Sequence, residues 1–223
     1  CARKLWVLTP DSRMPAVIWR RGKDQLSWLE SHNEAYGRLG GVAAVNRVDN
    51  VKTAIVEGAG AWGRINPVYR SYARTVGFHI DACQPRHANG KGKAEAKVRL
   101  TRLRVNPASR RFEGLEDLQG WSDRRVQRWA EQAICPATGR PVVESWQEEQ
   151  PFLGQPERLP MPFDVVVTRP VSRDCMVHFE NRAYCVPFSH AGRLVEVRGC
   201  ATTVQIWAAG QLLKEYARGT AER

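Results

Sequence analysis

The sequence predicts an α/β layer domain with a mixed sheet, followed by a small all-β barrel. Three observations support this fold class. Strand-like and helix-like patterns alternate over residues 1–150, which is typical of helices packed on a sheet. Four prolines crowd residues 151–163 and indicate a stiff linker. Over residues 164–218, short apolar runs alternate with turn residues, a pattern that predicts a barrel of about five or six strands.

Apolar periodicity and capping residues define the elements of the first domain in chain order. Turn residues at 10–13 separate two β-prone runs and predict a hairpin. Gly40 and Gly41 end a helical pattern, and Asn66 with Pro67 is typical of the first turn of another helix. The expected elements are strands at 5–9 and 16–19, a helix at 24–39, a strand at 42–48, a helix at 66–76, a strand at 78–80, a basic helix at 91–104 and helices at 113–133 and 141–149.

The barrel is expected from six apolar, β-prone runs. Dipeptides with turn chemistry, such as Glu180-Asn181 and Ala209-Gly210, separate these runs at short spacing. The expected strands lie at 165–167, 176–179, 183–186, 194–197, 204–207 and 211–213.

The charge of the chain is strongly positive and unevenly distributed. The formal net charge is +11, and residues 84–111 hold nine Lys or Arg against Glu95 alone. Such a field indicates an anionic partner, with nucleic acid ahead of an anionic membrane surface. No apolar run approaches the ~18 residues that a transmembrane helix needs. Six scattered cysteines without zinc spacing indicate reduced thiols in a cytoplasmic protein.

Two acids stand out by their place in the predicted fold. Asp49 follows a predicted strand at its carboxyl end, where open α/β sheets place their ligands. Glu95 lies early in the basic helix that follows the last strand and a glycine-bearing loop. Carboxylates from two elements that meet at one sheet edge can hold Mg²⁺. The alternatives are a strand-ending turn for Asp49-Asn50 and a solvated salt bridge for Glu95.

An ordered series of motifs resembles the IstA-type insertion-sequence transposases. The first four are Leu39-Gly40-Gly41-Val42, Val48-Asp49-Asn50-Val51-Lys52-Thr53-Ala54, Pro85-Arg86 and Lys91-Gly92-Lys93-Ala94-Glu95. Residues 137–141 are similar to a later motif of that family. Residues 181–187 and 192–197 resemble the barrel that follows the core, both in this family and in Mu-type transposases. The likeness covers nearly the whole chain, with Ala43 and Ala94 as small departures from the family wording.

The resemblance implies an RNase H-like integrase core, with residues 1–150 as the core, 151–163 as the linker and 164–218 as the barrel. Asp49 and Glu95 would be the second and third acids of a triad that binds two Mg²⁺ (or Mn²⁺) ions. The first acid is expected on a strand upstream of residue 5, so the chain is expected to be an N-terminally truncated and inactive fragment. Asp11 and Asp24 are not credible substitutes for it.

The resemblance also implies the partners. Residues expected to contact DNA phosphates are Arg86, Lys91, Lys93, Lys97, Arg99, Arg102 and Arg104. An ATPase helper of the IstB type, a homo-oligomer on paired DNA ends and a nucleoid-associated location in the cytoplasm are expected with them. Two alternatives stay open: a non-catalytic DNA-binding or assembly module derived from a transposase, and an unrelated RNA-binding protein with a basic helix and a barrel.

Overall fold

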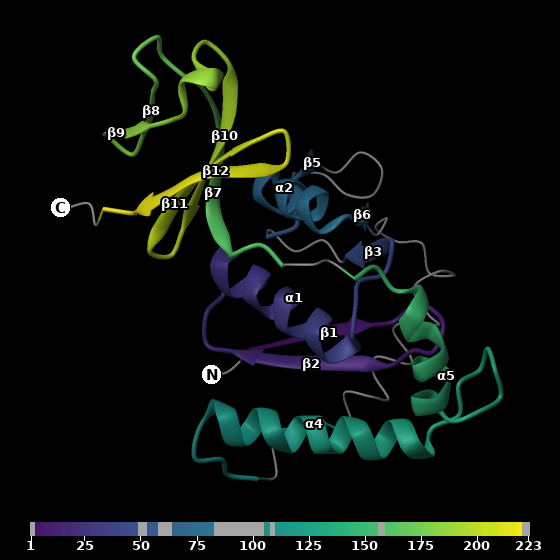
Figure 1. Cartoon of the computed structure of the whole chain (residues 1–223). Coiled ribbons are helices and arrows are strands. Elements are labelled where there is room, and N and C mark those ends of the chain that lie inside the picture. Colours follow the sequence, from purple (N-terminus) through teal and green to yellow (C-terminus); the bar gives the residue numbers. More distant parts are fainter. Residues whose placement is uncertain are drawn as a thin grey trace.

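A computed structural model describes residues 3–48, 53–57, 64–82, 105–107, 110–155 and 159–219. It combines a mixed α/β part with a C-terminal antiparallel sheet domain (Figure 1). The predicted basic helix at 91–104 lies outside the described residues. No helix among the described residues is both long and apolar enough to cross a bilayer.

The predicted hairpin forms the centre of the first domain and is covered on both faces. Strands β1 (Arg3–Leu8) and β2 (Pro15–Arg20) pair in antiparallel fashion. Helix α1 (Gln25–Leu39) lies on one side of the hairpin and α4 (Leu115–Gln132) on the other (Figure 1). Because both faces are covered, Ala16, Val17, Ile18 and Trp19 of β2 are all buried. This explains why β2 reads as a continuous apolar run.

Helix α4 also satisfies the outer edge of β2. The Gln119 side chain accepts a hydrogen bond from the Trp19 backbone N–H at 3.0 Å and donates one to the Val17 carbonyl at 2.7 Å. The Trp19 indole Nε1–H donates to Ser122 Oγ at 2.8 Å. A side-chain amide thus replaces a neighbouring strand, which leaves fewer unpaired backbone groups at this edge.

The capping residues that predicted α1 and α2 act as expected. Asp24 Oδ1 accepts from the Ser27 backbone N–H at 2.9 Å, and this hydrogen bond lowers the pKa of Asp24. Gly40 ends α1 with a φ of 74°, a left-handed conformation that glycine adopts without strain. Helix α2 (Pro67–Val76) begins after Asn66, whose Oδ1 accepts from the Val68 N–H at 2.9 Å.

The expected strand at 42–48 is shorter than predicted. Strand β3 (Val45–Val48) begins three residues late because Val42 exchanges two backbone hydrogen bonds of 2.8 Å with Gly154. Strand β6 (His79–Ala82) runs parallel to β3, with Val45 opposite His79 and Val48 opposite Ala82. A small antiparallel pair, β4 (Ile55–Glu57) with β5 (Arg64–Ile65), was not predicted, because strands of two and three residues are too short for a periodic signal.

A buried aromatic cluster joins α1 to α2. His32 is 4% exposed and lies within 6.2 Å, centroid to centroid, of the rings of Trp28, Tyr36, Tyr69 and Tyr72. Its Nδ1 lies 2.9 Å from the Trp28 carbonyl oxygen and donates to it. Burial lowers the pKa of His32 to about 4, although the hydrogen bond to Trp28 acts in the opposite direction. The imidazole is therefore neutral in the folded chain near neutral pH.

His32 should make the stability of the fold depend on pH. An unfolded His gains its proton near pH 6.5, whereas the folded pKa of His32 is about 4. The stability that this group supports is therefore complete above about pH 6.5 and is lost as the pH falls toward 4, by about 2 kcal/mol at about pH 5. The free energy of unfolding in urea, measured at about pH 6.5 and about pH 5, should show this loss in the native chain. The loss should be smaller in His32→Gln. His79→Gln, which changes an exposed histidine, should behave like the native chain.

Helix α5 (Val142–Glu149) holds the turn of the β1–β2 hairpin in place. The Glu149 carboxylate accepts from the backbone N–H groups of Asp11 and Ser12, both at 3.0 Å, and from Ser12 Oγ at 2.5 Å. Burial raises the pKa of Glu149, but these hydrogen bonds outweigh it and the net shift is downward. The carboxylate is thus kept ionised as the acceptor at the turn.

The proline-rich segment packs against the first domain where it is described. A short 3₁₀ turn, η3 (Gln150–Phe152), follows α5, and Leu153 is buried. The Pro160 carbonyl accepts from Asn33 Nδ2 of α1 at 2.9 Å. The described part of this segment therefore follows the surface of the first domain rather than standing free of it.

The C-terminal domain consists of two antiparallel sheets around one core. Its strands lie close to the predicted positions. Four strands pair in the order β12-β11-β10-β7, and β8 pairs with β9. Val177, Tyr184, Val197 and Ile206 come from both sheets and share one hydrophobic cluster. The strands are β7 (Phe163–Pro170), β8 (Met176–Phe179), β9 (Arg182–Cys185), β10 (Leu194–Cys200), β11 (Thr203–Ala208) and β12 (Gln211–Ala217).

A buried arginine joins this domain to α2. The Arg198 side chain of β10 is 3% exposed, and its guanidinium carbon lies 4.8 Å and 4.3 Å from the ring centroids of Phe163 and Trp207. It donates to Thr75 Oγ1 at 2.7 Å and to Glu196 Oε1 at 2.7 Å. Burial raises the pKa of Glu196, but the hydrogen bonds from Ser71 and Arg198 outweigh this effect and the net shift is downward. Glu196 and Arg198 therefore form an ionic pair.

Removing the Arg198 charge should destabilise the junction. Arg198→Met keeps much of the stacking surface but leaves the Glu196 carboxylate with fewer donors in a mostly buried place. We expect a loss of about 3 kcal/mol in the free energy of unfolding, as for other broken buried pairs. Arg193→Met, at an exposed position of the same domain, is the control and should stay within about 0.5 kcal/mol of the native chain. Equal urea midpoints for the two variants would contradict the role assigned to Arg198.

Candidate nucleic-acid interface

The side chains that the sequence analysis assigned to the site lie outside the described residues. These are the two acids Asp49 and Glu95, and the basic residues Arg86, Lys91, Lys93, Lys97, Arg99, Arg102 and Arg104. Their assignment stays a prediction. What the structure describes is the framework that leads to them: β3, which ends at Val48, and β6, which ends at Ala82.

The two strands end at the same edge of the sheet. They are parallel, and the last residue of β3 lies opposite the last residue of β6, Val48 to Ala82. Helix α2 lies between them in the chain, so β3, α2 and β6 form a crossover unit. Ligands of open α/β sheets bind outside the carboxyl ends of such strands. This edge is therefore the candidate site.

An exposed ion pair marks this edge. Arg47 Nε lies 2.7 Å from Asp81 Oδ2, and the two residues are direct neighbours across the β3–β6 register. An exposed pair of this kind contributes little to stability. This ion pair was not predicted, because the strand expected at 78–80 ended before Asp81. The polar-apolar alternation of His79, Ile80 and Asp81 was the signal that could have extended it.

Two partly buried hydrogen bonds tie β3 to α1 and α2 to α1. Asn46 Nδ2 donates to the Tyr36 hydroxyl at 3.0 Å, and the Tyr72 hydroxyl donates to Asn33 Oδ1 at 2.6 Å. Burial raises the pKa of Tyr36 and of Tyr72 far above the usual tyrosine value, so both hydroxyls stay protonated. The hydrogen bond from Asn46 of β3 to Tyr36 of α1 therefore involves a hydroxyl whose charge does not change over the ordinary pH range.

The described residues do not assemble a metal site by themselves. Within the described ranges, no group of three or more His, Cys, Asp or Glu is arranged to hold a metal ion. The two upstream acids that the sequence analysis set aside have local structural roles: Asp24 caps α1, and the Asp11 backbone donates to Glu149. The four described cysteines, Cys135, Cys175, Cys185 and Cys200, form no disulfide with one another.

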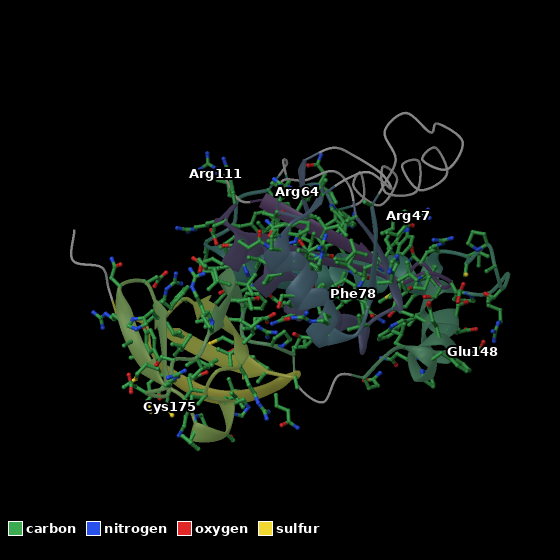
Figure 2. The ribbon with its side chains drawn as sticks, turned by 90° about the horizontal axis from the view of Figure 1, so that it is seen from above. Arg47, Arg64, Phe78, Arg111, Glu148 and Cys175 are labelled. Carbon is green, nitrogen blue, oxygen red and sulfur yellow. The ribbon has the colours of Figure 1, made fainter. Side chains whose placement is uncertain are left out.

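Cationic side chains lie along one side of the first domain. Figure 2 shows Arg47, Arg64 and Arg111 on this side, away from Cys175 in the C-terminal domain. Arg47 and Arg64 come from β3 and β5, and Arg111 precedes α4. Arginine at several separate elements of one side suits contact with an extended anion rather than with a small one.

Comparison with known proteins places these features in a family context. Residues 156–223 match the model of the Mu transposase, C-terminal domain. A transposase from Aminobacter aminovorans is 33% identical over 194 residues, which are 85% of this chain and 37% of that protein. The transposase for insertion sequences IS1326/IS1353 from Pseudomonas aeruginosa is 30% identical over 193 residues, 85% of this chain and 38% of that protein.

A more distant relative extends the comparison. The transposase for insertion sequence element IS21 from Pseudomonas aeruginosa is 28% identical over 180 residues, 76% of this chain and 43% of that protein. The chain thus spans less than half of the length of each of these relatives.

Proposed function

We propose that residues 1–150 of this chain belong to an RNase H-like integrase core that cuts transposon ends and joins them to target DNA. The chain is similar to insertion-sequence transposases, and its residues 156–223 match the model of the Mu transposase, C-terminal domain. The observation that carries the proposal is the parallel β3–β6 pair, because its two carboxyl ends meet at one sheet edge. The transposase relatives agree with this proposal over 85% of the chain.

Asp49 and Glu95 both come after strands that end at this edge. Asp49 is the residue after Val48, and Glu95 belongs to the segment that follows Ala82. Chain segments that leave neighbouring parallel strands at the same edge begin close together, so their carboxylates can serve one site. Carboxylate oxygens are the donors that Mg²⁺ and Mn²⁺ prefer, so the donor set fits. Asp49 and Glu95 would hold the ions together with a third acid.

The reaction would be phosphodiester cleavage followed by transesterification. Bound ions would lower the pKa of an attacking oxygen and neutralise charge on the leaving one. Water attacks a phosphorus at the transposon end, and the bond to the 3′ oxygen breaks, which frees a 3′-hydroxyl. That hydroxyl then attacks a phosphorus of the target and displaces a target 3′ oxygen. The number of phosphodiester bonds is unchanged in the second step, so no external energy source is needed for it.

The basic loop and helix would position the DNA. Arg86, Lys91, Lys93, Lys97, Arg99, Arg102 and Arg104 would contact phosphates and carry no sequence information directly. By the same resemblance, the complete transposase would act as a homo-oligomer on paired ends, with an ATPase helper of the IstB type, at the nucleoid.

Metal binding tests the acidic site. Mn²⁺ or Mg²⁺ titration followed by NMR or calorimetry should show weak binding by this chain. Asp49→Asn and Glu95→Gln should each abolish it, since each removes a charged ligand from the same ions. Glu148→Gln is the matched control, because it neutralises an exposed carboxylate that pairs with Arg140 elsewhere. Binding that is indifferent to both Asp49 and Glu95 would favour a non-catalytic DNA-binding or assembly module.

DNA binding tests the basic segment. The affinity of this chain for duplex DNA should fall with rising salt, because each phosphate contact releases counterions. The double variant Lys91→Gln/Lys93→Gln should lower the slope of log affinity against log salt by about 1.8, or about 0.9 for each lost contact. A slope equal to that of the native chain would show that these two lysines do not contact the backbone. A preference for A-form or single-stranded RNA would instead support the RNA-binding alternative.

A further inference from the structure

The outer side of α4 carries arginines that form no ion pair with a carboxylate among the described residues. Arg124 and Arg128 are exposed and lie four residues apart, so they share one face of the helix. Arg110 and Arg111 are exposed in the segment that leads into α4. In the part of the chain that the structure describes, no carboxylate forms an ion pair with any of these four side chains. By contrast, Arg38 and Arg140 on neighbouring elements each pair with an acid.

Two aromatic rings hold guanidinium groups on the same flank. The Arg110 guanidinium carbon lies 5.6 Å from the Phe112 ring centroid, and that of Arg125 lies 6.0 Å from the Trp121 centroid. The two rings are 5.4 Å apart, edge to face. Both rings also pack against the core between α4 and the hairpin, which fixes their positions. A guanidinium held over a fixed ring loses less conformational entropy when it binds a ligand than a freely rotating one does.

The α4 surface, defined as Arg110, Phe112, Trp121, Arg124, Arg125 and Arg128, is separate from the candidate site. Helix α4 lies on the side of the β1–β2 hairpin opposite α1, whereas β3 and β6 lie beside α1 and α2, on the other side of the hairpin from α4 (Figure 1). Arg124 and Arg128 lie one helical turn apart and can approach the same polyanion together. Guanidinium groups also match the oxygens of phosphate in geometry and can bind them with two parallel hydrogen bonds.

The geometry points to the α4 surface as a second contact surface for the DNA backbone, which rests on the proposed function and extends it. Arg124 and Arg128 contact phosphates directly, and Phe112 and Trp121 keep the flanking guanidinium groups in place. The same molecule then touches DNA at two places: at the predicted basic loop and helix, and across the outer layer of α4. The occupant is the sugar-phosphate backbone of duplex DNA, with no base readout.

The test is the salt dependence of binding to a fluorescein-labelled duplex of arbitrary sequence. The double variant Arg124→Gln/Arg128→Gln should lower the slope of log affinity against log salt by about 1.8. The control Arg140→Gln/Arg173→Gln removes the same total charge from exposed positions elsewhere, one of them in an ion pair with Glu148. It should leave the slope within about 0.5 of the native value, since no phosphate contact is lost.

The outcomes separate this inference from the function on which it rests. A native slope in Arg124→Gln/Arg128→Gln, together with a reduced slope in Lys91→Gln/Lys93→Gln, would overturn the α4 surface and keep the proposed function. Equal losses in the α4 variant and its charge-matched control would also overturn the α4 surface, because only total charge would matter. If the native chain bound no duplex at any salt concentration, both proposals would fail. The inference is supported if Arg124→Gln/Arg128→Gln lowers the slope and the control Arg140→Gln/Arg173→Gln does not.

Discussion

The guanidinium group of Arg198 determines how the two parts of the chain are joined. It comes from β10, is sandwiched by Phe163 and Trp207, and donates to Thr75 on α2. Glu196, two residues earlier, accepts from Ser71 Oγ on the same helix at 2.7 Å. Since an unpaired buried charge is costly, these partners must stay together. Helix α2 also connects β3 to β6, so the element that anchors the C-terminal domain is the one that sets the candidate edge.

In the first domain, the β1–β2 hairpin lies between two layers of helices. Helices α1 and α2 share the aromatic cluster around His32, and α4 and α5 share the opposite cluster around β2. The carboxyl ends of β3 and β6 belong to the first of these layers and the arginines of α4 to the second. The candidate edge and the α4 surface therefore belong to different layers of the first domain.

Local chemistry predicted the elements whose ends are capped. Asp24, Gly40, Asn66, Pro67 and Gly77 define α1 and α2 within a residue of their observed limits. Local chemistry failed where distant residues intervene. Val42 is β-prone but pairs with Gly154, which shortens β3. The amide of Gln119, which completes the edge of β2, has no sequence signature because its partners lie about a hundred residues earlier.

The candidate site depended on resemblance more than on pattern. A carboxylate after a strand, as at Asp49, is more often part of a turn than a ligand, so its position alone left the turn open as an alternative, and the ordered motifs favoured the ligand. The parallel pairing of β3 with β6 supports that choice through topology. The α4 surface escaped notice because its residues are spread over two segments, 110–112 and 121–128, and join only when the helix packs. Spacing alone does not show that Phe112 meets Trp121.

The contacts that complete the first domain span most of its length, and this has a consequence for its synthesis. The hairpin turn is held by Glu149, which lies 137 residues after Ser12, and β2 is covered by α4 at a separation of 100 residues or more. A growing chain therefore exposes the apolar β2 until α4 and α5 leave the ribosome. In the C-terminal domain most pairs of strands are neighbours in the sequence, so they can pair soon after both strands have been synthesised. The interval before α5 emerges is thus the period in which the apolar surface of β2 is most open to aggregation.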